Sequence, residues 1–296
     1  MSRAGADWRA EVALAGIALA WGSTFVLVKN ALDDASTLLF LAVRFGFGTL
    51  ALWLLFRRRG PIIKARSEWI AGASAGFWLF AGYFLQTAGL RLTTPSKSAF
   101  LTGLYIVLVP LLGSLVYRKE LHPFELLGVA LATAGMALMT SPGWQLRIGL
   151  GDLLTIGCAV AFAAHMLVLE HYARLIRLES LAVVQVATVA AGAGMLCWWV
   201  ETPKFVWSAK LLVALAVTSL IATALAFMLQ TWAQARTTAT RAALIFALEP
   251  VFAGVTSVIT GKESFSAEML TGAVFILSGI VLAQLKRAGY RKHPSK

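Results

Sequence analysis

The sequence predicts an all-α integral membrane protein, in which ten transmembrane helices form two inverted five-helix repeats around a central cavity. Three observations predict this fold: an apolar composition, ten apolar runs of spanning length, and a pattern that occurs twice along the chain. Of the 296 residues, 59% are hydrophobic and only 14% are charged. A soluble domain carries about 25% charged residues, so most of this protein's surface is expected to lie in lipid.

Ten apolar runs are long enough to cross a bilayer, which takes about 20 mostly apolar residues. They are expected to be helices, because a backbone in lipid must satisfy its own hydrogen bonds. The expected helices are 12–30, 37–56, 70–90, 98–117, 124–140, 152–172, 181–200, 209–232, 242–260 and 267–285. Basic residues precede the first run as in a signal peptide, but the length of the run indicates a retained helix.

The basic residues lie in clusters between the apolar runs. They are densest at Arg57–Arg59 and in the tail, and they favour every second connection, starting with the N-terminal segment. This bias marks the cytoplasmic side of a membrane protein, so both termini are expected in the cytoplasm. A net charge of +12 distributed in this way does not indicate a nucleic-acid partner.

The pattern of the first half recurs in the second half. Phe84–Thr87 matches Met228–Thr231. The further matched pairs are 93–94 with 237–238, 108–110 with 248–250, and 119–120 with 262–263. We therefore divide the chain into a first repeat, 12–140, a second repeat, 152–285, and a basic cytoplasmic tail, 286–296. Because each repeat has an odd number of helices, the copies insert with opposite orientations, as in many secondary transporters.

Several short motifs occur in the same order as in a known family. They are Ala20–Phe25, Val43–Phe45, Pro110 with Glu120, and Glu249–Pro250 with Glu263. With these motifs the chain resembles the EamA-type transporters of the drug/metabolite transporter superfamily, from about residue 16 to residue 285. The resemblance implies an exporter of amino acids, other small metabolites or toxic compounds in the cell inner membrane, the aromatic amino acid exporters included. One departure is that Val109 stands where the second repeat has Glu249.

Charged groups at membrane depth are costly and usually face a cavity or a partner. Glu249 lies near the middle of the ninth expected helix. It is interpreted as a proton-coupling carboxylate or as a ligand of a substrate amine, with pairing to Arg44 or to a neighbouring helix as the structural alternative. Arg44 either binds a substrate carboxylate or satisfies backbone carbonyls, and the second reading is favoured. Pro110 and Pro250 are expected to break their helices, because proline lacks an N–H group.

Three uncharged polar residues are further candidates. His165 is interpreted as a hydrogen-bond donor to substrate or a proton relay, with a packing role as the equal alternative. Gln86 and Gln230 occupy the same position in the two repeats, so inverted topology is expected to place them toward opposite membrane faces. They would act at two gates or bridge helices by hydrogen bonds.

The aromatic candidates for a cavity wall are Trp21, Trp78, Tyr83 and Tyr105. Trp21 lies in the middle of its expected helix, away from the interfacial belt where tryptophan is common. A wall of this kind suits apolar or aromatic substrates, or cations. Alternatively, these rings face lipid or the core, as most aromatic residues of membrane helices do.

Enzyme and cofactor motifs are absent from the sequence. There is no phosphate loop and no HExxH motif, and Cys158 and Cys197 lack a metal-type spacing. No cofactor, metal site or catalytic residue is therefore predicted. The leading hypothesis is a secondary transporter that exports amino acids, with aromatic ones favoured, by alternating access in contact with membrane lipid. A proton is a candidate coupling ion. The alternatives are an exporter of hydrophobic drugs or cations, a lipid-modifying enzyme, and a receptor.

Overall fold

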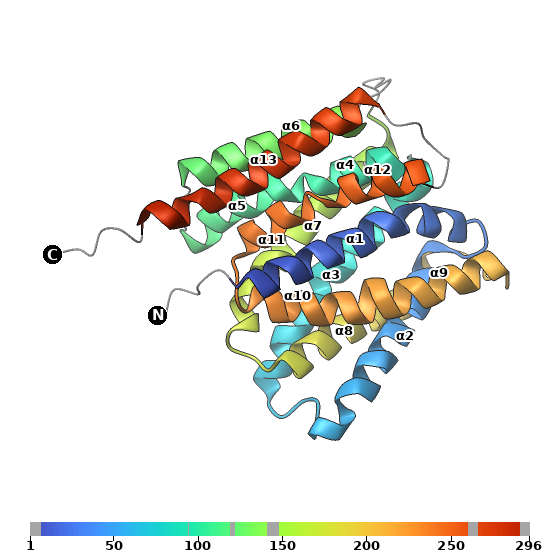
Figure 1. Ribbon diagram of the computed structural model, residues 1–296. Helices are drawn as coiled ribbons and strands as arrows, with labels where there is room; N and C mark the ends of the chain where they lie inside the picture. The colour runs from blue at the N-terminus through green and yellow to red at the C-terminus, as the bar shows by residue number, and fades with distance from the viewer. Residues whose placement is uncertain (1–6, 94, 119–121, 141–147, 260–265, 291–296) are drawn as a thin grey trace.

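The computed structural model describes residues 7–93, 95–118, 122–140, 148–259 and 266–290. Figure 1 shows a bundle of long helices, with the start of α1 and the end of α13 on the same side. Glu120, Glu263 and residues 291–296 of the predicted tail lie outside the described residues.

The described chain is almost entirely helical, as the sequence predicts. The helices are α1 (Trp8–Ala31), α2 (Thr37–Phe56), α3 (Arg66–Leu92), α4 (Pro95–Gly103), α5 (Tyr105–Tyr117), α6 (Pro123–Thr140), α7 (Leu150–Ala173), α8 (Leu178–Val200), α9 (Ala209–Ser219), α10 (Ala226–Gln234), α11 (Ala239–Phe246), α12 (Glu249–Ile259) and α13 (Ala267–Tyr290). Within the described residues, seven helical stretches are long and apolar enough to cross a membrane, and shorter apolar helices occur at 123–138 and 267–283. The 27-residue α3 covers the expected segment 70–90.

The fourth, eighth and ninth expected segments are interrupted helices. α4 and α5 meet at Leu104, α11 and α12 meet at Ala247–Leu248, and a π-helical turn, η2 (Leu220–Leu225), joins α9 to α10. The prediction of a break at Pro110 is wrong in position, because Pro110 lies inside α5. Membrane helices tolerate proline where neighbouring groups satisfy the backbone carbonyl that it leaves unpaired, whereas Gly103, beside the interruption, is a poor helix former.

The helices of the two halves pack on each other in matching pairs. α2 packs against α8, and α6 packs against α13 along one edge of the bundle (Figure 1). α3 contacts α7 and α8, while α10 contacts α1 and α9 contacts α2. Likewise, α5 contacts α7 and α12 contacts α1. If each helix is replaced by the equivalent helix of the other half, every one of these contacts becomes a contact of the same set. Two copies of one structural unit produce this pattern.

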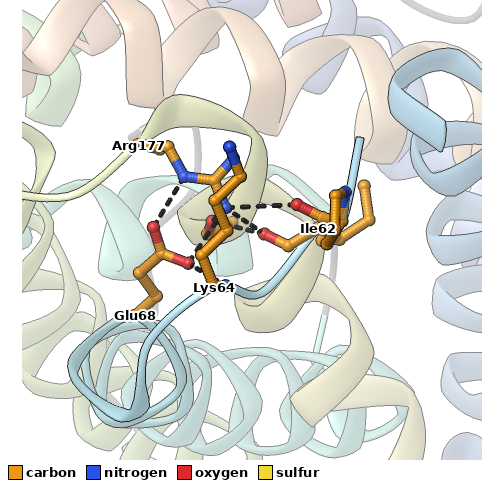
Figure 2. A network of polar contacts seen from close by, with 6 residues as sticks. Ile62, Lys64, Glu68 and Arg177 are labelled. Atoms are coloured by element: carbon orange, nitrogen blue, oxygen red, sulfur yellow. Dashed lines mark hydrogen bonds and ion pairs between the residues drawn. The ribbon is translucent and has the colours of Figure 1, made fainter. Parts of the chain in front are cut away.

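A polar network joins the start of α3 to the start of α8 (Figure 2). Arg177 donates to both carboxylate oxygens of Glu68, from Nε at 2.6 Å and from Nη2 at 3.0 Å. The carbonyl oxygen of Ile62 accepts from Arg177 at 2.7 Å and from Ser180 at 2.6 Å. The hydrogen bonds from Arg177 lower the pKa of Glu68 from its ordinary 4.5 to about 2. The network thus connects the two halves of the chain on the side where α1 begins.

We expect Glu68→Gln to lower the free energy of unfolding at neutral pH by roughly 1–3 kcal/mol, because it leaves part of this network unpaired. Since folding lowers the pKa of Glu68, its contribution is fully present above about pH 4.5 and is lost as the pH falls toward 2. The melting temperatures of wild type and variant should therefore differ at neutral pH and converge below pH 4.5. Glu179→Gln is the matched control, since the side chain of its partner Arg59 is 65% exposed. An equal decrease in melting temperature in the two variants would contradict this prediction.

Candidate functional site

A cavity lies at the centre of the bundle, between the two halves of the chain. It holds about 700 Å³ of space free of atoms, with the open space at its mouth included. The lining residues are Trp21, Thr24, Phe25, Val28, Arg44, Leu79, Tyr83, Gln86, Thr87, Leu90, Thr102, Tyr105, Phe162, His165, Met166, Phe227, Gln230, Phe246 and Glu249. Small-molecule sites are lined mainly by apolar and aromatic side chains with a few convergent polar groups, and this cavity has such a lining.

The cavity reaches toward the end of the bundle where α1 finishes. Val28 and Leu90 line it close to the last residues of α1 and α3. Toward the opposite end, Leu14 and Ala18 of α1 are fully buried in a cluster that includes Ala243 of α11. Side-chain packing therefore closes the cavity on the side where α1 begins.

Trp21 of α1 lies on the cavity wall, and Gly22 beside it sets how closely α1 approaches α12. A Cβ atom at Gly22 would overlap the carbonyl oxygen of Glu249, so the glycine lets α1 lie directly against α12. The indole N–H of Trp21 donates to the carbonyl oxygen of Ala222 at 2.9 Å. The Trp21 ring packs against Phe246, with 5.0 Å between the ring centroids. This side chain is therefore fixed at both ends on the cavity wall.

The π-helical turn η2 supplies a backbone acceptor to the wall. Its residue Ala222 accepts hydrogen bonds from Trp21 and from Nη2 of Arg44, the latter at 3.3 Å. A π-helical turn shifts the register of backbone hydrogen bonds and often occurs at functional sites. Here it joins α9 and α10 of the second half to two side chains of the first half.

Arg44 is a buried cation, with only 4% of its surface exposed. Its Nε donates to Thr223 Oγ1 at 2.9 Å, and its guanidinium lies 4.9 Å from the ring centroid of Tyr83. Within the described chain, no carboxylate forms an ion pair with Arg44, so the expected alternative of a pair with Glu249 does not occur. A buried charge without a counter-ion is costly, and a carboxylate in the cavity would relieve that cost.

Glu249 is the first residue of α12 and follows the helix break directly. It is 8% exposed, and its Oε2 lies 3.4 Å from the hydroxyl of Tyr105, which donates to it. The start of a helix stabilises a negative charge. None of the cations that the structure describes pairs with this carboxylate. It can therefore accept a proton or the ammonium group of a ligand.

His165 lies on the cavity wall and is the end of a hydrogen-bonded chain. Its Nε2 lies 2.9 Å from Gln185 Oε1, and Gln185 Nε2 donates to Thr231 Oγ1, also at 2.9 Å. The chain joins α7, α8 and α10, which fixes the imidazole ring in place. In the described part of the protein, no group of three or more His, Cys, Asp or Glu residues could hold a metal ion.

Gln86 and Gln230 both line the cavity, and their placement toward opposite membrane faces stays a prediction. Gln86 donates to Thr102 at 3.2 Å and so joins α3 to α4. Gln230 donates to Gln234 of its own helix at 3.0 Å. The Gln230 Oε1 atom is buried and has no partner among the described residues.

A family comparison agrees with this architecture. The model of the EamA-like transporter family matches the chain twice, over residues 8–141 and 149–285. The chain belongs to the EamA-like transporter family. The resemblance inferred from its motifs is thereby confirmed, and the apolar helices are those of a multi-pass membrane transporter.

Relatives of this EamA-like transporter cover almost its whole length. A protein of Archaeoglobus fulgidus named "Uncharacterized transporter" is 34% identical over 94% of this chain and 86% of its own. "Uncharacterized transporter YvbV" of Bacillus subtilis is 25% identical over 94% of this chain and 92% of its own. A solved structure titled "Crystal structure of protein" has the same fold, with a TM-score of 0.79 and 20% identity over 96% of this chain and 100% of that chain.

The structure brings most of the predicted site residues of this EamA-like transporter to one cavity. Those that line it are Trp21, Arg44, Tyr83, Gln86, Tyr105, His165, Gln230 and Glu249. The prediction is wrong for Trp78, which is 37% exposed and lies beside Phe77 outside the cavity. Trp78 is five residues from Tyr83, which is about 140° around the helix.

Sequence reasoning missed four phenylalanines on the cavity wall: Phe25, Phe162, Phe227 and Phe246. Phenylalanine is ordinary in apolar helices, so the residue type alone carries no signal. The internal repeat could have found Phe227, because it occupies the position that Tyr83 holds in the first copy. These two rings meet edge to face, with 6.1 Å between their centroids.

Proposed function

We propose that this protein is a secondary transporter that exports amino acids, with aromatic ones favoured, across the cell inner membrane by alternating access. Ten membrane-spanning helices form inverted repeats, 12–140 and 152–285, and both termini lie in the cytoplasm. The EamA-like family supports the transporter class, and the names of the relatives support it over an enzyme.

A pair of opposite, separately held charges in the cavity carries the proposal. Arg44 comes from the first repeat and Glu249 from the second, and each lacks an ionic partner among the described residues. The equivalent positions offer no second pair, since Val109 stands opposite Glu249 in the repeat. A zwitterion is the ligand that gives each charge its counter-ion, with its carboxylate at Arg44 and its ammonium at Glu249.

Aromatic rings around these charges support an aromatic side chain on the substrate. Tyr83 meets Phe162 and Phe45 edge to face at 5.3 Å and 4.8 Å, and Trp21 packs against Phe227 at 5.7 Å. Offset and edge-to-face contacts between such rings add roughly 0.5–1.5 kcal/mol each. A substrate ring could make similar contacts with the wall.

The experiment is counterflow in proteoliposomes with labelled tryptophan. Tryptamine lacks the carboxylate and indole-3-propionate lacks the ammonium, so these compounds separate the two recognition elements. We expect exchange of tryptophan, with weak competition by either analogue. If tryptamine is exchanged and tryptophan is not, the protein is an exporter of hydrophobic cations, which a lone Glu249 among aromatic rings would also serve. Exchange of neither compound, nor of any other amino acid, would end the substrate proposal.

We expect Arg44→Gln to raise the half-saturation concentration for tryptophan by roughly 10- to 100-fold, the effect of removing a charged hydrogen-bond donor. The affinity for tryptamine, measured by its inhibition of counterflow, should change little because tryptamine has no carboxylate. Arg44→Lys is the matched control and should retain part of the tryptophan affinity. If Arg44→Gln weakens the binding of tryptophan and tryptamine equally, Arg44 supports the cavity wall and does not bind the substrate carboxylate.

A proton is the proposed coupling ion, and Glu249 is the proposed carrier. In cells that export the substrate, dissipating the proton gradient should then slow export. A rate that follows the substrate gradient alone would indicate facilitated transport.

A further inference from the structure

Two ion pairs occupy equivalent positions in the two repeats. Lys97 Nζ lies 2.6 Å from Asp152 Oδ2, and Arg241 Nη1 lies 3.9 Å from Glu11 Oε1. Each cation is the third residue of a half-helix, α4 or α11, and each acid lies in the first turn of α7 or α1. Each pair therefore joins the half-helix of one repeat to the first helix of the other repeat.

The two pairs lie at opposite ends of the bundle. Glu11 is in the first turn of α1. At the other end of α1, Lys29 donates to the carbonyl oxygen of Thr93 at 3.1 Å, and the hydroxyl of Thr93 donates to Asp152 at 3.0 Å. The distance along α1 from Glu11 to Lys29 is about 27 Å at 1.5 Å per residue. The pairs thus border the two ends of a pathway through the cavity.

Each half-helix is also held by its own repeat, through equivalent contacts. Lys29 holds the chain just before α4, and Glu170 of α7 accepts from the first backbone N–H of α11, that of Ala239, at 3.0 Å. The start of each half-helix is therefore tied both within its own repeat and to the opposite repeat. The ties between repeats, Lys97–Asp152 and Arg241–Glu11 among them, must change when the repeats move against each other.

In this structure one of the two ion pairs is short and the other is long, and the cavity likewise extends toward one end of the bundle and is closed at the other. The cavity extends toward the end that carries Lys97–Asp152, and this pair is short. Asp152 also accepts from the N–H of Gly149 at 2.8 Å. Arg241–Glu11, at the closed end, is long. Exchanging the conformations of two equivalent repeats would yield the opposite access state, with the short and long pairs exchanged.

From this asymmetry we infer that the two ion pairs are reciprocal latches of alternating access, each short in only one access state. The inference rests on the transporter function proposed above, and it names the contacts that bias the two states. Lys97–Asp152 stabilises the state seen here, and Arg241–Glu11 stabilises the opposite one. Removing one acid should therefore shift the equilibrium in one direction, and removing the other acid should shift it in the other.

The test uses two cysteine reporters on the cavity-facing side of α1. Val28→Cys lines the cavity, and Ala18→Cys lies in the packed closed end. Each is placed in a background with Cys158→Ala and Cys197→Ala, and labelling by a membrane-impermeant maleimide is timed in right-side-out and inside-out vesicles. We expect Asp152→Asn to slow labelling of Val28→Cys about fivefold and to speed that of Ala18→Cys, and Glu11→Gln to do the reverse. A fivefold shift corresponds to about 1 kcal/mol, near the value of one partly exposed ion pair.

The double exchange Lys97→Asp with Asp152→Lys restores a pair of opposite charges and should restore the labelling rates. It also keeps the test valid if Asp152→Asn alone folds poorly. Glu179→Gln, which removes an exposed pair with Arg59, should change neither rate. Shifts in the same direction from Asp152→Asn and Glu11→Gln, or no shift from either, would overturn the inference. Because labelling needs no substrate, such a result is distinct from a failure of amino-acid counterflow.

Discussion

Replacing Glu249 with glutamine is expected to lower the rate of tryptophan counterflow by roughly 10- to 100-fold while the protein still folds. The amide has the shape of the carboxylate and can still accept from the Tyr105 hydroxyl, which lies 3.4 Å away. It cannot offer a counter-charge to an ammonium group, nor carry an exchangeable proton. A charged hydrogen bond to a substrate contributes roughly 1.5–3 kcal/mol, and 2.7 kcal/mol is about a factor of 100.

Two variants separate a binding role of Glu249 from a structural one. Tyr105→Phe removes only the hydroxyl that donates to Glu249, and it should slow transport by a few fold. Glu68→Gln, in the network on the side where α1 begins, should leave the half-saturation concentration for tryptophan unchanged. Elution as a single symmetric peak in detergent checks that each variant folds. Normal transport by a well-folded Glu249→Gln variant would mean that the carboxylate serves packing alone.

The membrane fold could be predicted in outline because lipid imposes strong rules on apolar runs. The expected segment 152–172 lies within α7, and 181–200 lies within α8. The interruptions could not be placed in the same way. The residues of η2, 220–225, include neither proline nor glycine, so the sequence carries no local signal for the π-helical turn. Conversely, Pro110 gave a plain signal and sits inside a continuous helix.

Sequence reasoning could find the site residues whose polar groups are costly to bury in a membrane. It could not find aromatic residues of a kind that is common in apolar helices. Arg44, His165 and Glu249 could be predicted because charged or polar groups at membrane depth are costly and usually face a cavity or a partner. Trp78 was misplaced because residue type says nothing about which side of a helix faces the cavity. The ion pair of Lys97 could not be predicted, because its partner Asp152 is distant in sequence. Long-range pairing of this kind follows from the packing of the repeats.

The close contact between α6 and α13 yields the largest expected effect on stability. A methyl group added at Gly128 would lie 2.6 Å from the carbonyl oxygen of Gly279, and one added at Gly279 would lie 2.5 Å from that of Gly128. Gly135 makes a similar approach to Gly272. Both neighbouring atoms belong to the backbone, so they cannot move away by rotation as the end of a side chain can. The two helices can pack at this distance only while these positions are glycine.

We therefore expect Gly128→Leu to destabilise the protein at or beyond the upper end of the ~1–3 kcal/mol that overpacking usually costs. The matched control is Gly46→Leu in α2, where an added Cβ has no neighbour within 4 Å. Leucine favours a helix over glycine by several tenths of a kcal/mol, so the control should keep or slightly raise the melting temperature in detergent. Gly128→Leu should lower the melting temperature and the yield of folded protein. Equal behaviour of the two variants would show that α6 and α13 can separate without loss, and that glycine at their contact is not required.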